Sequence, residues 1–328
     1  MAIPTLSLDI GNTAVKWRLR RGRAVHQGRA FHPAECVAAI LAAVGNGPKG
    51  SWQLAYSAVA HPQKVAQVLR PLERLLQTSG QRLVAQRRLV LAGSSSMVEV
   101  TCDYRAPAEL GADRWAAVLG VSRQASRIWR SQQAQADARR TEGPAGQRPG
   151  GPHARGIRPP EAFALWLVSA GTATVIDLVE AGFTTDGRLA WLHFLGGCIL
   201  PGIGLTREAL SQATGALGAY MPHATARFRI EGPPRNARDA IGYGLAVAQS
   251  SPLLALPQPA GVIVHGGYAK DWLRYFQAVQ SHAALQRHGA QRQRESAPFL
   301  LQAPHLVLDG VEQWASATRP PQSRSTRG

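Results

Sequence analysis

Alternating apolar and polar residues at the start of the chain predict a β-hairpin over residues 3–20. An apolar strand from Leu6 to Ile10 meets a turn of small residues and returns through Val15, Trp17 and Leu19, which alternate. Residues 165–177 repeat this pattern around Gly171 and Thr172. Glycine at such a bend lets backbone N–H groups approach a phosphate closely. Two hairpins of this kind indicate two similar lobes that close on one nucleotide, although each alone also fits an ordinary hairpin.

The remaining periodicity predicts alternating strands and helices, which is typical of an α/β fold. Helical spacing covers residues 34–44, 62–76 (with a new turn or kink at Pro71), 112–120, 206–213, 238–248 and 272–279. Apolar runs predict strands at residues 52–59, 89–91 and 261–265, and a last short strand and turn at 305–311. Residues 194–205 form a glycine-rich segment whose glycine density indicates close approach to a ligand or a subunit.

The pattern also indicates domain boundaries. We expect a first lobe at residues 1–122 and a second at 161–317, since 328 residues can build two cores. Residues 123–160 have few large apolar side chains and several Gly and Pro residues, so they predict a mobile basic insertion. Residues 281–298 predict a second polar insertion, and residues 318–328 a disordered tail.

The net charge of +17 adds a nucleic-acid hypothesis, because phosphate neutralisation dominates non-specific binding. The arginines, however, gather in residues 123–158, in 287–294 and after 319, where they are typical of solvated loops. A nucleic-acid partner is therefore not expected.

The sequence has no run of 18 apolar residues, so we predict no membrane span, and no signal core starts the chain. Three scattered cysteines fit a reducing cytoplasm.

Residues 104–120 carry the densest candidate chemistry. Gly111 predicts a turn, and the helix that follows places Asp113 and Arg114 in its first turn. A carboxylate at this position complements the helix dipole. Asp113 is therefore either a simple helix cap or a carboxylate that points out of the turn toward a ligand.

Several of these motifs together resemble the type III pantothenate kinases, and most closely the proteobacterial branch once called Bvg accessory factor homologues. Residues 9–13 resemble the first phosphate motif of that family, and Gly171-Thr172-Ala173 the second. Tyr104 and Pro107 followed by Gly111-Ala112-Asp113-Arg114 resemble the pantothenate motif. Residues 196–202 resemble the family's Gly-Gly-x-Ile-x-Pro-Gly segment. His265-Gly266-Gly267 stands where the family has an adenosine-side Thr-Gly-Gly turn.

The resemblance implies a two-lobed, ribonuclease H-like (ASKHA) actin-like ATPase fold and a homodimer. It implies a cytoplasmic enzyme that phosphorylates pantothenate with ATP, the first step of coenzyme A biosynthesis. Mg²⁺ and a monovalent cation, K⁺ or NH₄⁺, would be cofactors. Asp113 matches the proton acceptor, and Tyr104, Gly111, Ala112 and Arg114 match pantothenate contacts. The nucleotide positions implied are Asp9, Ile10, Gly11, Asn12, Thr13, Ala14, Val15, Lys16 and Thr172, with Asp9 also expected at the hydrated Mg²⁺.

Three positions depart from the family pattern. Ser169 replaces the aspartate that many members use for the monovalent cation, and a hydroxyl is a poorer cation ligand than a carboxylate. Ala237 stands where a threonine usually reaches pantothenate across the dimer. His265 replaces the adenosine-side threonine. These changes leave a second hypothesis open, a non-catalytic accessory or regulatory protein on the same fold.

Overall fold

The computed structural model divides the chain into two compact units. Residues 1–123 and 305–328 belong to the first unit, and residues 124–304 belong to the second. The structure describes residues 3–45, 50–78, 82–89, 98–141, 161–222, 230, 232–252, 256–286 and 297–317. The predicted tail lies outside these residues, as do residues 142–160 of the first predicted insertion and 287–296 of the second.

The first unit is built around a five-stranded sheet. Its strands are β1 (Thr5–Ile10), β2 (Val15–Arg21), β3 (Ala24–Ala30), β4 (Ser51–Ala58) and β5 (Arg82–Arg88), with the short β6 (Glu99–Cys102) outside that sheet. Its helices are α1 (Pro33–Val44), α2 (Pro62–Thr78), η1 (Pro107–Glu109), α3 (Ala112–Gly120), η2, which begins at Val121, and α9 (Leu306–Ala317). The helix α2 continues through Pro71 as a single helix.

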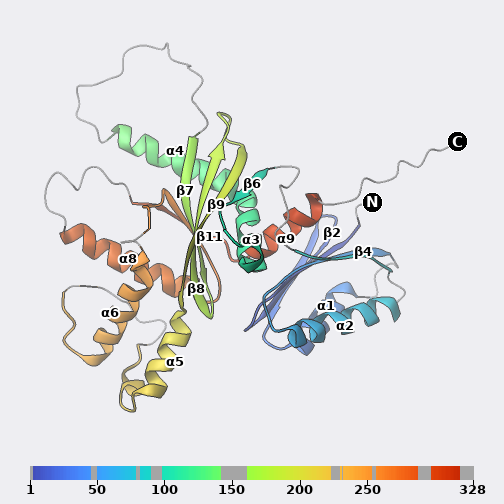
Figure 1. Ribbon diagram of the computed structural model, residues 1–328, viewed down its shortest axis with the longest axis horizontal. Helices are drawn as coiled ribbons and strands as arrows, with labels where there is room; N and C mark the ends of the chain where they lie inside the picture. Colours follow the sequence, from blue (N-terminus) through green and yellow to red (C-terminus); the bar gives the residue numbers. More distant parts are fainter. Residues whose placement is uncertain are drawn as a thin grey trace, which may run out of the picture. The chain divides into compact units, whose positions relative to one another are not determined.

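The two faces of the first sheet differ in character. The strand order is β3-β2-β1-β4-β5, with β2 antiparallel to both of its neighbours and β1, β4 and β5 parallel. Leu8, Trp17 and Leu54 point to one face and form the core with α1 and α2. The helices α3 and α9 lie over the other face (Figure 1). That second face carries Asp9, so it is the face that matters for the site.

The segment from His305 is where the structure corrects the prediction. We predicted a strand and turn at residues 305–311 within the second lobe, but these residues begin helix α9 of the first unit. The long helix is held there by ion pairs to strand β2. Arg18 Nη1 lies 2.6 Å from Asp309 Oδ1, and Arg20 Nη2 lies 3.0 Å from Glu312 Oε2. Nearly every side of α9 is buried, because Glu312 and Gln313 on its polar side are covered as well, so the helix has little surface in contact with solvent.

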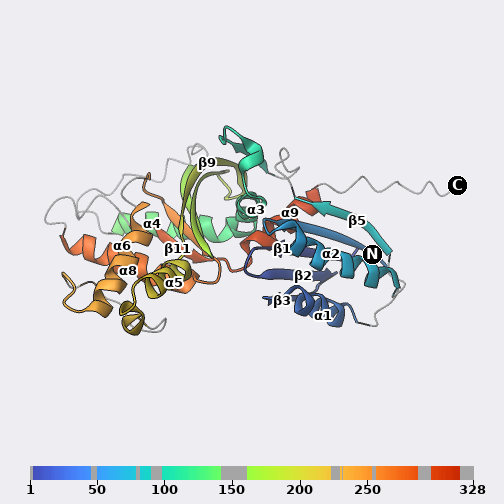
Figure 2. The same ribbon diagram turned by 60° about the horizontal axis from the view of Figure 1, so that its bottom comes forward.

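The second unit contributes five strands to a six-stranded sheet. Its strands are β7 (Glu161–Ala170), β8 (Ala173–Phe183), β9 (Leu189–Pro201), β10 (Gly261–His265) and β11 (Phe299–Gln302). Its helices are α4 (Ala125–Thr141), α5 (Ile203–Ala213), η3 (Leu217–Tyr220), α6 (Ala237–Ser250) and α8 (Ala269–Gln286). The predicted glycine-rich segment is thus largely strand β9. The helices α5, α6 and α8 gather on one face of the sheet (Figure 2).

The second unit repeats the strand order of the first. Its strands run β9-β8-β7-β10-β11, with β8 antiparallel to both neighbours and β7, β10 and β11 parallel. The strands β7, β8, β9, β10 and β11 correspond in this order to β1, β2, β3, β4 and β5. In each sheet, the predicted hairpin is therefore followed by two further strands parallel to its first strand. This repeat confirms the prediction of two similar lobes and the actin-like α/β fold class.

The start of the predicted insertion is folded, contrary to our expectation. Residues 125–141 form helix α4, in which Ile128 is fully buried. Trp129 contacts the rings of Phe163 and Phe183, with centroids 6.4 and 5.7 Å away. Gln132 and Gln135 also donate side-chain hydrogen bonds to the carbonyls of Ala260 and Ala297, so the helix is anchored although its overall hydrophobicity is low. In the described part of the chain, no helix is long and apolar enough to cross a membrane.

Candidate functional site

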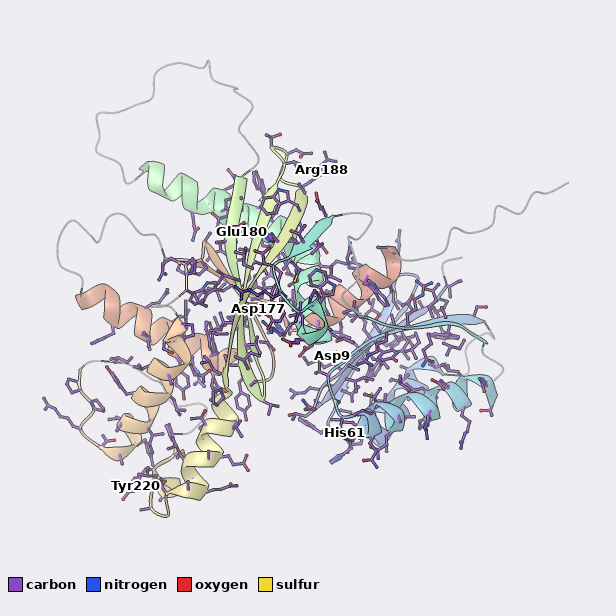
Figure 3. The ribbon with its side chains drawn as sticks, in the orientation of Figure 1. Asp9, His61, Asp177, Glu180, Arg188 and Tyr220 are labelled. Carbon is purple, nitrogen blue, oxygen red and sulfur yellow. The ribbon has the colours of Figure 1, made fainter. Side chains whose placement is uncertain are left out.

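Asp9 stands at the end of β1 beside the first turn (Figure 3). The turn is closed by a hydrogen bond from the Gly11 N–H to the Ala14 carbonyl, 3.1 Å. Asn12 and Thr13 at its tip are exposed. Lys16, opposite Asp9 on β2, places its Nζ 3.3 Å from Asp9 Oδ2. The turn therefore combines exposed backbone, a carboxylate and a cation, which suits a metal–phosphate group.

The side chains of Ile10 and Val15, also expected near the nucleotide, are fully buried in the core. Their contribution is structural: the Ile10 carbonyl accepts hydrogen bonds from the N–H groups of Val59 and Ala60, which tie the turn to the end of β4. Any contact of these two positions with a nucleotide would come from the backbone.

Lys64 is a residue of this turn that sequence reasoning missed. It lies in the first turn of α2 and donates from Nζ to the Asn12 carbonyl at 2.7 Å. Partial burial lowers the pKa of this ammonium. Lys64 comes shortly after β4, which is parallel to β1, and the carboxyl ends of parallel strands meet at one edge of a sheet. Only this position in the fold could have indicated a role for Lys64. Two lysines thus flank the candidate phosphate turn.

Asp113 lies in the first turn of α3, as predicted, but it is not the N-cap residue. Gly111 occupies that position, and it has no side-chain cap. Asp113 Oδ1 accepts the N–H of Arg114 at 2.8 Å, so one oxygen does serve the helix start. A Cβ on Gly111 would lie 2.7 Å from the same oxygen, which explains why glycine precedes Asp113 by two residues. Helix capping accounts for Oδ1 and leaves Oδ2 for another partner.

The charge of Asp9 acts on Asp113. Burial raises the pKa of Asp113, and the nearby charge of Asp9 raises it further. Burial also raises the pKa of Asp9, against the opposing effect of Lys16. Two neighbouring carboxylates with raised pKa values, on separate elements, are typical of a site that binds a metal or moves a proton. Carboxylate oxygens are the ligands that Mg²⁺ prefers, so Asp9, which lies beside the turn, fits that ion.

Arg114 and Tyr104 form a second pair beside Asp113. The guanidinium of Arg114 is buried, donates from Nη1 to Tyr104 Oη at 3.1 Å, and lies 5.4 Å from the centre of the Tyr104 ring. The stacked ring fixes the plane of the guanidinium. A planar cation fixed in this way can recognise a carboxylate. The structure thus brings Asp9, Gly11, Lys16, Tyr104, Asp113 and Arg114 into one unit.

The second predicted phosphate turn lies between β7 and β8. The Gly171 N–H donates to the Ala173 carbonyl at 3.0 Å, so this turn is one residue shorter than the first, and Thr172 is exposed. The Gly202 N–H donates to the Thr172 carbonyl at 3.0 Å, and a Cβ on Gly202 would overlap that oxygen. Gly202 of the glycine-rich motif therefore lets the chain that follows β9 pass close to the turn.

The turn after β10 lies beside the Thr172 turn. Gly266 has φ +104°, a conformation that favours glycine, and Tyr268 donates its N–H to the Ala170 carbonyl at 2.9 Å. Two glycine-containing turns thus meet at the carboxyl end of β7. In α/β sheets this edge is the usual place for a ligand.

Ser169 is the position matched to a monovalent cation. Its neighbours across the adjacent strands are Val175 and His265, and His265 is buried. These three residues supply a hydroxyl and an imidazole but no carboxylate. A hydroxyl alone is a weak ligand for K⁺, so this donor set does not fit the cation that the resemblance implies.

Ala237 is the first residue of α6. The preceding Asn236 caps the helix, with its Oδ1 accepting the Asp239 N–H at 2.9 Å. Ala237 itself offers only a methyl group. Thr172, Ser169 and Ala237 all belong to the second unit.

Comparison with known proteins agrees with the motifs. Residues 5–128 and 158–252 match the family model of type III pantothenate kinase. A type III pantothenate kinase from Azoarcus sp. (strain BH72) is 30% identical, over 98% of this chain and 96% of the relative. Another, from Cupriavidus pinatubonensis, is 30% identical over 76% of this chain and 81% of the relative.

Among solved structures, a ROK family glucokinase from Streptomyces griseus aligns with a TM-score of 0.39 and 15% identity, over 96% of this chain and 99% of that chain. The fold assignment rests instead on the repeated strand order of the two sheets. The family model covers more than half of the chain, and the Azoarcus relative spans nearly all of it. This chain therefore belongs to the type III pantothenate kinase family.

Proposed function

We propose that this protein transfers the γ-phosphoryl group of ATP to the terminal hydroxyl of pantothenate and forms 4′-phosphopantothenate. The observation that carries the proposal is the position of Asp113, next to Asp9 on one side and to the Arg114–Tyr104 pair on the other. This grouping provides a proton acceptor between a phosphate turn and a candidate carboxylate-binding group.

Asp113 acts as the general base in this proposal. The hydroxyl oxygen of pantothenate attacks the γ-phosphorus while its proton passes to Asp113, and the bond from the γ-phosphorus to the bridging oxygen breaks to release ADP. A raised pKa makes Asp113 a stronger base than an ordinary aspartate. Phosphoryl transfer otherwise depends on in-line positioning and on neutralisation of charge.

Charge neutralisation falls to the residues of the first turn. Lys16 and Lys64 supply positive charge next to the exposed backbone of Asn12 and Thr13. Asp9 would hold Mg²⁺, which neutralises the phosphates when bound. Thr172 would contact the phosphates from the second unit, and the N–H of Gly11, committed to Ala14, keeps the turn in shape.

Substrate recognition falls to Arg114. The carboxylate of pantothenate would accept hydrogen bonds from the guanidinium, which Tyr104 holds in a fixed plane. Gly111 and Ala112 form the adjoining backbone at the start of α3. Ala237 at the start of α6 supplies no hydrogen bond, so binding depends more on Arg114 than in relatives with a threonine there.

We also propose that two copies of the chain pair through the second unit. Large apolar side chains are exposed there on β9, α5, η3 and α6, namely Ile199, Leu205, Tyr220 and Val247. Exposed apolar groups on neighbouring elements are typical of an interaction surface. Analytical ultracentrifugation at micromolar concentration should show a dimer, and Leu205→Asp should shift it to monomer. A monomeric wild type would contradict the pairing.

The cellular location proposed is the cytoplasm. Cys36, Cys102 and Cys198 are all free thiols, which fits a reducing compartment. Fluorescence of a tagged chain in fractionated cells would test this placement.

An assay of ADP release with and without pantothenate tests the proposed reaction, with mass spectrometry of the product as confirmation. The proposal predicts pantothenate-dependent ADP release and a product heavier by one phosphoryl group. The accessory-protein hypothesis predicts nucleotide binding without this product. The Asp113→Asn variant, assayed in parallel, distinguishes turnover by this site from a contaminating kinase.

A further inference from the structure

The sheet face that carries Asp9 is polar along strand β1. Thr5, Ser7 and Asp9 alternate along β1 on this face, and α9 packs across it. Leu6, Leu8 and Ile10 point to the opposite, apolar face. A polar face under a helix is costly unless its groups are hydrogen-bonded, so each of its polar atoms calls for an explanation.

Two hydroxyls on this face have no partner. Ser7 and Ser57 are both fully buried, and neither Oγ makes a hydrogen bond in the described part of the protein. Arg18, the neighbour of Ser7 on β2, is committed to Asp309. Buried side-chain oxygens are usually satisfied, so an unpartnered pair next to a candidate site indicates a role that the ligand-free arrangement does not use.

The strand register distinguishes the two serines. Ser57 on β4 lies directly opposite Asp9 on β1, whereas Ser7 lies opposite Ala55. Residues paired in register on neighbouring strands point to the same face about 4.8 Å apart. Ser57 therefore flanks Asp9 on the β4 side, and Lys16 flanks it on the β2 side, with its Nζ 3.3 Å from Asp9 Oδ2.

We propose that Ser57 is a positioning residue for Asp9, whose hydroxyl donates to the Asp9 carboxylate when Lys16 turns to the nucleotide phosphates. The inference rests on the proposed use of a metal–nucleotide at the first turn. A serine hydroxyl can turn between staggered rotamers without any backbone movement. Lys16 is on a flexible stem and its side chain is 22% exposed, so it can leave Asp9. Ser57 then keeps the carboxylate oriented.

This arrangement separates two states of Asp9. Without a nucleotide, the ion pair with Lys16 satisfies the carboxylate and Ser57 is unpartnered. With a metal–nucleotide, Lys16 moves to the phosphates and Ser57 replaces it. A hydrogen bond to a ligating carboxylate fixes its orientation, and loss of such an outer partner typically weakens metal affinity about tenfold or more.

Calorimetric titration of MgADP into Ser57→Ala, with Ser7→Ala as the matched control, tests the inference. Both substitutions remove one buried, unpartnered hydroxyl, so the melting temperature without nucleotide should change equally little in both. Ser57→Ala should weaken MgADP binding and raise the Mg²⁺ concentration for half-maximal activity by about tenfold. Ser7→Ala should match wild type, and Ser57→Thr, which keeps the hydroxyl, should restore binding.

Equal MgADP affinity in Ser57→Ala, Ser7→Ala and wild type would overturn the inference, as would a wild type that does not bind MgADP. Pantothenate is not present in the titration. A protein that binds MgADP tightly through Ser57 but does not phosphorylate pantothenate would therefore contradict the proposed function while the role of Ser57 stands.

Discussion

The carboxylate of Asp113 lies close enough to that of Asp9 for the charge of Asp9 to raise its pKa. This relationship joins two motifs that are far apart in the sequence, the first phosphate turn and the first turn of α3. Because each carboxylate is costly to ionise beside the other, a bound cation or a transferred proton relieves the repulsion.

The pH dependence of turnover should reveal this coupling. Asp113 must be ionised to accept a proton, so activity should fall as the pH drops through its raised pKa, above the usual aspartate range. This fall is the acid limb of the pH–rate profile. Asp9→Asn removes the repelling charge and should move the acid limb to lower pH at saturating MgATP. Glu35→Gln removes an exposed charge elsewhere and should leave the limb in place. An acid limb unmoved by Asp9→Asn would contradict the coupling.

Stability should depend on pH through the same carboxylate. The pKa of Asp113 is higher in the folded chain than in the unfolded chain, so the protonated form favours folding. That contribution is complete below the unfolded pKa and is lost as the pH rises through the folded pKa. Asp113→Asn should therefore raise the melting temperature at pH 8, and the gain should vanish toward pH 4. A variant less stable than wild type at pH 8 would show that ionised Asp113 does not destabilise the folded chain.

Helices α3 and α9 cross at two glycines. A Cβ on Gly310 would overlap the Ala116 carbonyl, and one on Gly120 would overlap the Leu306 carbonyl. Gly310→Ala should lower the free energy of unfolding by about 1–3 kcal/mol in urea denaturation, because overpacking forces the helices apart. Gly215→Ala, where a Cβ meets nothing within 4 Å, is the control. Equal stability of the two variants would show that the crossing is loose.

Potassium should not activate this protein. Ser169 and its neighbours Val175 and His265 supply no carboxylate, so replacing KCl by tetramethylammonium chloride at equal ionic strength should leave the rate unchanged. Ser169→Asp introduces the missing carboxylate and should make nucleotide affinity and rate dependent on K⁺. Strong activation of the wild type by K⁺ would show that other ligands complete a cation site.

Much of the fold could be predicted because its core strands have clear local patterns. The two hairpins were visible from the alternation of Val15, Trp17 and Leu19 and from its counterpart after Gly171. The strand β3 was missed because it is an edge strand with mostly exposed, polar residues, so it has no apolar alternation. The helix α9 was mistaken for a strand because a short apolar run does not distinguish a buried helix from a strand.

The site was predictable to the extent that each residue belongs to a local motif. Asp113 and Arg114 were named from the start of their helix, and Asp9 from the resemblance of its turn to the family's first phosphate motif. Lys64 and Ser57 were not, because their relevance comes from β4 lying parallel to β1, a pairing with no local signal in the sequence. The contact between Arg18 and Asp309 was hidden for the same reason, since 291 residues separate the two.

The most direct test of the account is pantothenate phosphorylation by Asp113→Asn. Asparagine keeps the size of the side chain and can still accept the Arg114 N–H, but it cannot take up the proton of the alcohol. If Asp113 is the general base, the rate should fall by a factor of about 10²–10⁴ while MgADP affinity is retained. A near-wild-type rate would contradict the catalytic role and reduce Asp113 to a residue of the helix start.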